Sequence, residues 1–191
     1  MAIEFVFINR QVNTIIETEQ LRATQGETEN LAHWLIWTDD KASYAILAAT
    51  PASVDHFVGS YEHGMQTIHA ILKRLDTADL EPQERVMLSD FKTWLARYDS
   101  DSLKSFAAKR NGNEMEARRL AIATPTEYGD GIAERLTLDL HERLDAASSS
   151  MLADAQTTKL ITVIAGFVAI VLGVLTTALM IEILTLHGDP R

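Results

Sequence analysis

The sequence predicts an all-α protein, an antiparallel up-down four-helix bundle whose last helix continues into a single carboxyl-terminal transmembrane helix. Three observations support this fold class. Prolines are few, and they divide residues 1–158 into segments long enough for extended helices. Apolar side chains in these segments recur every three or four residues, as they do along one face of a helix. Residues 160–181 form a single uncharged apolar run.

These features divide the chain into three parts. We expect the helical bundle in residues 1–158, the transmembrane helix in residues 159–184 and a short tail in residues 185–191. Each boundary follows from the point where the apolar pattern changes from one helical face to a continuous run, or ends.

The first predicted helix has an ambiguous phase. Its apolar side chains begin at intervals of three and four residues, with Phe5, Ile8, Val12 and Ile15. If this phase continues, Glu19, Arg22 and Gly26 face the bundle axis and form a polar ligand pocket, with Trp34 and Trp37 as aromatic walls. A shift of phase would leave these residues on a solvated face instead. The sequence leaves both alternatives open.

The second and third helices are marked by proline. Thr50 and Pro51 form a helix start in which the missing N–H of proline costs nothing. The third helix begins at Pro82, and Gly112 follows cations where that helix is expected to end. The apolar positions of the two helices are Val54, Phe57, Tyr61, Met65, Ile68, Leu72 and Leu75, and Leu88, Phe91, Leu95, Tyr98 and Phe106.

The fourth helix is expected to begin at a capping box of Thr124, Pro125 and Glu127. Neither glycine nor proline interrupts the chain between Gly131 and Gly166. We therefore expect this helix to run without a break into the membrane. Its apolar positions are Ile132, Leu136, Leu140, Leu144, Ala147 and Met151.

The predicted membrane span extends from Leu160 to Ile181, 22 residues without a charge or a proline. A helix of this length is about 33 Å long, enough to cross a hydrocarbon core of about 30 Å. One face of the span carries small side chains every four residues, which would let two helices approach closely in a homodimer. These helix-dimer contact residues are Ala165, Ala169, Gly173 and Thr177.

Charge and composition exclude several classes of protein. The chain has 17 lysines and arginines against 27 aspartates and glutamates, a formal charge of −10, and the excess lies in residues 1–158. Nucleic acid is therefore not expected as a partner, because phosphate binding needs clustered cations. The absence of cysteine excludes disulfides, thiolate nucleophiles and cysteine-ligated metals.

No catalytic motif is recognisable. His141 and Glu142 begin like a zinc-protease helix, but Asp145 stands where the second histidine is required. No glutamate lies three residues before any histidine, so the di-iron Glu-x-x-His motif is missing as well. His56 and His63 are weak grounds for a metal, because solvated helix histidines are far commoner. We predict no enzyme, no catalytic residue, no cofactor and no metal site.

Two pairs of aspartates come close together in sequence. Asp39 with Asp40, and Asp99 with Asp101, fall where helices are expected to end or turn. Capping explains them more simply than acid–base catalysis does.

Four stretches carry a resemblance to a known family. They are FINRQVNTII near the start, LEPQERVMLSDFKTWLARYDS at residues 80–100, KRNGNEMEARRL at residues 109–120, and the alanine-rich run into residues 160–181. In this order they resemble the four-helix-bundle sensor domains of methyl-accepting chemotaxis receptors and related membrane histidine kinases. Where the family has a full first membrane helix, only MAIEFVFI stands here, and LHGDPR stands where the family continues into its output domain.

The resemblance implies a membrane-anchored sensory input module without its own output domain. Such a module is a homodimer in the inner membrane of a bacterium, with its bundle outside the cytoplasm and a signalling partner inside. A small-molecule ligand would shift the last helix, and the span would pass this shift inward. The alternative is a tail-anchored helical-bundle scaffold or adaptor that faces the cytosol, which needs no export signal before the bundle.

Overall fold

The computed structural model describes the backbone of residues 2–187 and the side chains of residues 12–173 and 176. These residues are all-α. The chain divides into two compact units at Ala146 and Ala147, inside the last helix, and each unit is described by itself. The helices are α1 (Ala2–Leu47), α2 (Pro51–Asp76), α3 (Pro82–Arg110), α4 (Glu114–Ala121) and α5 (Thr126–His187).

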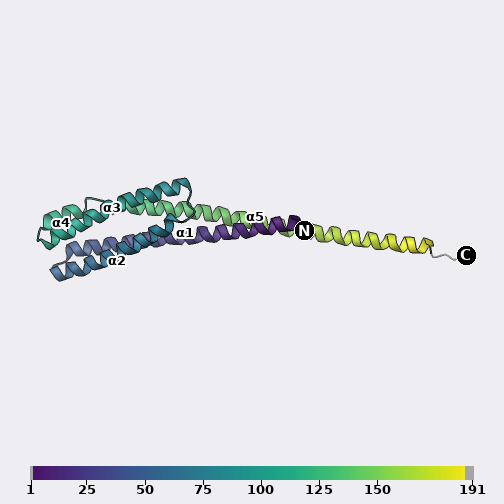
Figure 1. The fold of residues 1–191 in the computed structure, drawn as a ribbon, viewed down its shortest axis with the longest axis horizontal. Coiled ribbons are helices and arrows are strands. Elements are labelled where there is room, and N and C mark those ends of the chain that lie inside the picture. Colours follow the sequence, from purple (N-terminus) through teal and green to yellow (C-terminus); the bar gives the residue numbers. More distant parts are fainter. Residues whose placement is uncertain (1, 188–191) are drawn as a thin grey trace. The chain divides into compact units, whose positions relative to one another are not determined.

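The first unit confirms the prediction of four packed helices. In it α1, α2, α3 and the part of α5 up to Ala146 lie together, and the short α4 packs against α3 (Figure 1). The helix α4 is an addition that the sequence analysis did not predict. Local chemistry explains it, because the Asn113 side chain accepts a hydrogen bond from the Glu116 N–H and two arginines occupy the last turn.

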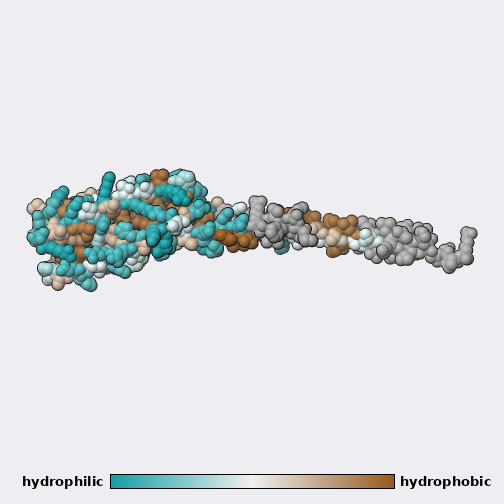
Figure 2. All heavy atoms as spheres, in the orientation of Figure 1, coloured by the Kyte–Doolittle hydropathy of each residue, from teal (hydrophilic) through white to brown (hydrophobic). Residues whose placement is uncertain are grey.

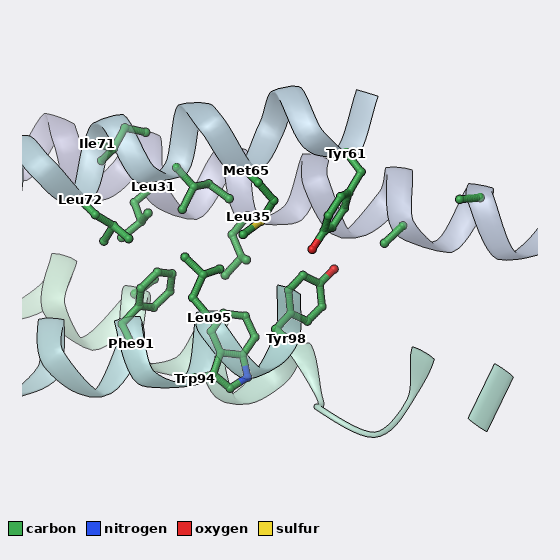
Figure 3. Packing of buried hydrophobic residues seen from close by; sticks show 14 of the residues in the cluster. Leu31, Leu35, Tyr61, Met65, Ile71, Leu72, Phe91, Trp94, Leu95 and Tyr98 are labelled. Atoms are coloured by element: carbon green, nitrogen blue, oxygen red, sulfur yellow. The ribbon is translucent and has the colours of Figure 1, made fainter. Parts of the chain in front are cut away.

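The core of this unit lies between the facing sides of the helices (Figure 3). Leu31 and Leu35 from α1 meet aromatic and aliphatic side chains of α2 and α3, and Leu136 and Leu140 of α5 complete the cluster. The predicted apolar faces of the second and third helices are therefore largely confirmed. Among their members the buried side chains are Val54, Tyr61, Met65, Ile68, Leu72, Leu75, Leu88, Phe91, Leu95, Tyr98 and Phe106.

Threonines occupy buried positions along α1. Each buried threonine hydroxyl donates to a backbone carbonyl three or four residues earlier at 2.6–2.8 Å, so no polar group is left unsatisfied. Val12 and Ile15, which set the phase expected from the sequence, are exposed instead. The structure thus has the phase shift that the sequence left open. The threonines are Thr18, Thr24, Thr28 and Thr38.

The helix starts agree with the sequence in two of three cases. Thr50 accepts from the Ser53 N–H at 3.2 Å with proline at the first turn of α2, and α3 begins at Pro82. The capping box predicted at Thr124 is wrong. The helix α5 begins at Thr126, and the Thr124 hydroxyl donates to Asp101 at 2.8 Å. At the end of α3, Gly112 has a positive φ of 75°, as expected for a residue that follows a helix.

Trp94 fixes the start of α5 on α3. Its indole N–H donates to the carbonyl of Pro125 at 3.0 Å. Its ring lies over Gly129, where an added Cβ would come within 2.3 Å of the ring carbons. Only glycine leaves room for this contact, so the indole sets how closely α5 approaches α3.

An ion pair joins the first turn of α3 to α5. The Glu84 side chain is 2% exposed, and its Oε2 accepts from Arg143 at 2.6 Å and from the Glu81 N–H at 2.6 Å. Arg143 also lies 3.2 Å from the Glu81 carboxylate. Because the other oxygen of Glu84 has no hydrogen-bond partner among the described residues, its charge depends on Arg143 for compensation.

The second unit contains the apolar run. Within the described part of the chain, α5 is the one helix long and apolar enough to cross a membrane, and its described side chains from Leu160 to Gly173 are exposed (Figure 2). Thr162 donates to a carbonyl four residues back, at 2.9 Å, and Thr176 does the same. These two hydroxyls are thus satisfied inside the helix, as a lipid environment requires.

We predict that Gly129→Ala lowers the free energy of unfolding by about 1–3 kcal/mol, because the new methyl group overlaps the Trp94 ring. Thermal unfolding of the purified protein, followed by circular dichroism, measures the change. Gly131→Ala is the matched control, since its Cβ meets no atom within 4 Å and alanine favours the helix. Equal stabilities of the two variants would contradict the role assigned to the contact.

We also predict that Arg143→Met lowers the free energy of unfolding by about 3–5 kcal/mol, because it leaves the buried Glu84 carboxylate without a cation. Adding Glu84→Gln should restore part of this loss in the same unfolding measurement. Arg119→Met is the control, because it removes an exposed pair with Glu116 and should change stability far less than Arg143→Met does. A double variant less stable than Arg143→Met alone would refute this account.

Candidate functional site

The residues of the pocket predicted from α1 do not come together. Glu19 and Arg22 have side chains 63% and 59% exposed, and they form an ion pair with each other on the surface. Arg22 and Trp34 are twelve residues apart on the same helix, which is about 18 Å. Gly26 is partly buried on the helix between them. Their placement follows from the phase shift that turns the threonines of α1 inward.

The two tryptophans instead join a cluster between α1 and α2. The rings of Trp34 and Trp37 meet edge to face, with centroids 5.2 Å apart, and the His63 ring lies 5.8 Å from Trp34. The Lys41 ammonium lies 5.0 Å from the Trp37 ring centroid. Both tryptophans are partly buried, so this cluster packs the hairpin of α1 and α2.

A cavity of about 540 Å³ lies among α1, α3 and α4, which is within the usual size range of small-molecule sites. We call it the α1–α3–α4 cavity. Its wall is mostly aliphatic and aromatic, with a carboxylate, three serine hydroxyls and two guanidinium groups. The lining residues are Asp39, Ala42, Ser43, Ile46, Leu47, Tyr98, Ser102, Ser105, Phe106, Met115, Arg118, Arg119, Ala121 and Ile122.

Asp39 links three helices at this cavity. Its Oδ1 accepts from the Tyr98 hydroxyl of α3 at 2.8 Å and from the Thr126 hydroxyl of α5 at 3.0 Å. The carboxylate is partly buried, and no ion pair of the described side chains includes it. Asp39 therefore holds the first residue of α5 against α1 and α3 while its charge stays unpaired.

Two buried tyrosines lie next to this carboxylate. Figure 3 shows the hydroxyls of Tyr61 and Tyr98 pointing toward one another, and the Tyr61 hydroxyl donates to Asp99 at 2.8 Å. Burial raises the pKa of both phenols well above the ordinary tyrosine value. The negative charge of Asp39 raises the pKa of Tyr98 further, while a hydrogen bond with Ser102 lowers it. Both rings therefore stay neutral donors in the folded protein.

The surroundings of Asp39 are acidic. Burial raises the pKa of Asp130, and the negative charges of Asp39 and Glu127 raise it further. Asp101, by contrast, has its pKa lowered, first by the hydrogen bond from Thr124 and then by nearby cations. The negative charge near the start of α5 is thus compensated at Asp101 but not at Asp39.

The helix α4 supplies the exposed rim of the cavity. Met115 and Ile122 are 84% and 78% exposed. Arg119 is held by Glu116 through two hydrogen bonds of 2.7 and 2.6 Å. Arg118 is exposed and forms no ion pair with a carboxylate in the described part of the chain. These exposed side chains form the solvent-facing edge of the cavity.

The structure corrects the interpretation of the paired aspartates as helix caps. Asp39 lies within α1, and Asp99 and Asp101 lie within α3. All three accept side-chain hydrogen bonds from other helices or loops. Sequence reasoning missed them because their partners lie on other helices or loops, which spacing along one helix does not reveal.

The other site predictions are only partly within the described residues. Ala165, Ala169 and Gly173 are exposed on α5, while the side chains of Thr177 and Ile181 lie outside the described part. Among the described side chains, no group of three or more histidines, aspartates or glutamates is arranged to hold a metal ion. His63 packs against the tryptophans, and His56 lies 5.3 Å from Phe57 between ring centroids. No protein-family model and no curated protein sequence matches the chain.

We predict a loss of stability above about pH 10, where tyrosine ionises in the unfolded chain. The folded-state pKa of Tyr61 and Tyr98 is raised, so their contribution is complete below that pH and is lost as pH rises further. Melting temperatures at pH 8 and pH 11 measure the change. The double variant Tyr61→Phe, Tyr98→Phe should show a smaller drop in melting temperature between pH 8 and pH 11 than wild type does. Tyr44→Phe, at an exposed position, should show the same drop as wild type. Equal losses in all three proteins would count against this assignment.

Proposed function

We propose that this chain is a membrane-anchored sensory input module of the chemoreceptor type. In this proposal the four packed helices are an antiparallel up-down bundle, and α5 continues from the bundle into a single transmembrane helix. A small molecule binds in the α1–α3–α4 cavity, and its binding displaces α5. The displacement passes along the span to a signalling partner in the cytoplasm.

One observation carries the proposal. Asp39, on the cavity wall, accepts a hydrogen bond from Thr126, the first residue of the helix that also contains the apolar run. A ligand that contacts Asp39 competes with or reorients this bond and so acts directly on the start of α5. Differential contact of this kind is what a ligand needs to shift a conformational equilibrium.

The membrane anchor is supported by the exposed apolar side chains of α5. From Leu160 to Leu172 the side chains are exposed, and a contiguous apolar surface of this kind is unfavourable in water. The resemblance of the sequence to chemoreceptor sensor domains adds the inner membrane of a bacterium, with the bundle outside the cytoplasm. It also adds a homodimer, in which the small side chains of Ala165, Ala169 and Gly173 would allow close helix contact.

Topology tests the proposal, and the lack of cysteine makes the test clean. We predict that Ala49→Cys, in the connection between α1 and α2, reacts with a membrane-impermeant maleimide in intact cells. Gly188→Cys should react only after the membrane is permeabilised. Wild type is the unlabelled control, and a variant without residues 160–181 should leave the membrane fraction.

The opposite pattern would reject the sensor. Labelling of Gly188→Cys in intact cells, with Ala49→Cys protected, places the bundle in the cytosol. That result would favour the tail-anchored scaffold or adaptor over a receptor for external ligands.

A further inference from the structure

Among the described side chains, no cation forms an ion pair with Asp39. Its hydrogen-bond donors, the hydroxyls of Tyr98 and Thr126, are both neutral. Hydroxyl donors bring no positive charge to a carboxylate, and a partly buried carboxylate is costly unless an opposite charge comes close. The negative charge of Asp39 also acts on neighbouring groups, since it helps to raise the pKa of Tyr98 and of Asp130.

The cations nearest to the cavity in the fold do not neutralise Asp39. Arg119 is committed to Glu116 by two hydrogen bonds. Arg118 lines the cavity from its exposed rim and comes within ion-pair distance of no described carboxylate. The described lining therefore places one carboxylate, Asp39, on the wall and two arginines of α4 at the rim, and neither arginine forms an ion pair with Asp39.

The rest of the wall suits an apolar group. Phe106 and Ser102 are buried, and Ile46 and Ala42 add aliphatic surface beside them. The Ser105 hydroxyl is already used, because it donates to the Ala117 carbonyl at 2.6 Å. Aromatic rings next to a carboxylate favour an organic cation, since ring faces attract positive charge and the rings also contact its hydrocarbon part.

We infer that the α1–α3–α4 cavity binds a small soluble organic ammonium ion with an apolar body. The ammonium group lies against Asp39 and the hydrocarbon part lies among Ile46, Phe106 and Ile122. This inference rests on the proposed function, because it names the class of ligand that the sensor cavity takes. It also explains how binding would act on α5, because an ammonium group at Asp39 would compete with the Thr126 hydroxyl for the same carboxylate.

Three probes of similar size and different charge test the inference on the full chain in detergent at pH 7. They are 2-phenylethylammonium, neutral 2-phenylethanol and the anion phenylacetate. Isothermal titration calorimetry should give the cation an affinity at least about 10-fold higher than that of the neutral alcohol, as expected for one charge-assisted contact. The anion should bind more weakly than the alcohol. This comparison needs no variant.

Asp39→Asn removes the charge and keeps an acceptor for Tyr98. It should lower the affinity for the cation about 10-fold and change that for the alcohol by less than about 2-fold. Asp40→Asn is the matched control, because the neighbouring side chain is exposed and outside the cavity, and it should leave both affinities unchanged. The two variants also control for uptake of the probes by detergent micelles. Circular dichroism shows whether each is folded.

Three results would overturn the inference. They are tighter binding of phenylacetate than of the cation, no saturable binding of any probe, and an unchanged affinity of Asp39→Asn for the cation. Failure of the proposed function is separate, because the labelling experiment reports membrane topology and the calorimetry reports the cavity. A cytosolic bundle that still binds the cation at Asp39 would reject the sensor topology and retain the ligand class.

Discussion

The contact between Trp94 and Gly129 is the constraint on which the rest of the candidate site depends. The indole lies so close to Gly129 that no Cβ fits there, and its N–H donates to the Pro125 carbonyl. This contact fixes the start of α5 on α3, and Thr126 consequently reaches Asp39. Without that placement the carboxylate would lose one of its donors, and the cavity wall would lose its link to α5.

Different interactions attach the two ends of the part of α5 that packs in the first unit, residues 126–146. Near its start, close packing against an aromatic ring is combined with hydrogen bonds between neutral donors and Asp39. Near Arg143, a buried ion pair with Glu84 makes the attachment. The desolvation cost of a buried ion pair offsets much of its Coulombic attraction, whereas loss of one partner leaves an uncompensated buried charge. The start of α5 thus combines tight packing with a carboxylate that forms no ion pair among the described side chains.

Pattern reasoning worked where packing follows helical periodicity and failed where polar groups enter the core. The faces of α2 and α3 were predictable because leucine and aromatic side chains mark them directly. The inner face of α1 was ambiguous because threonines occupy it. The hydroxyls of Thr24 and Thr28 donate to backbone carbonyls of the same helix, so these side chains can be buried at little cost. The short α4 and the later start of α5 involve side-chain hydrogen bonds of Asn113 with Glu116 and of Thr124 with the distant Asp101, and the spacing of apolar residues does not predict them.

By itself, the sequence determined the all-α class, the four packed helices and the apolar run, since each depends on the spacing of side chains along one helix. Only the tertiary structure decided which polar residues share a site. Asp39, Tyr98 and Thr126 are far apart in the chain, and they meet because three helices pack in one particular rotation about their axes. That rotation is set by close contacts such as the one between Trp94 and Gly129, and a linear pattern does not contain them.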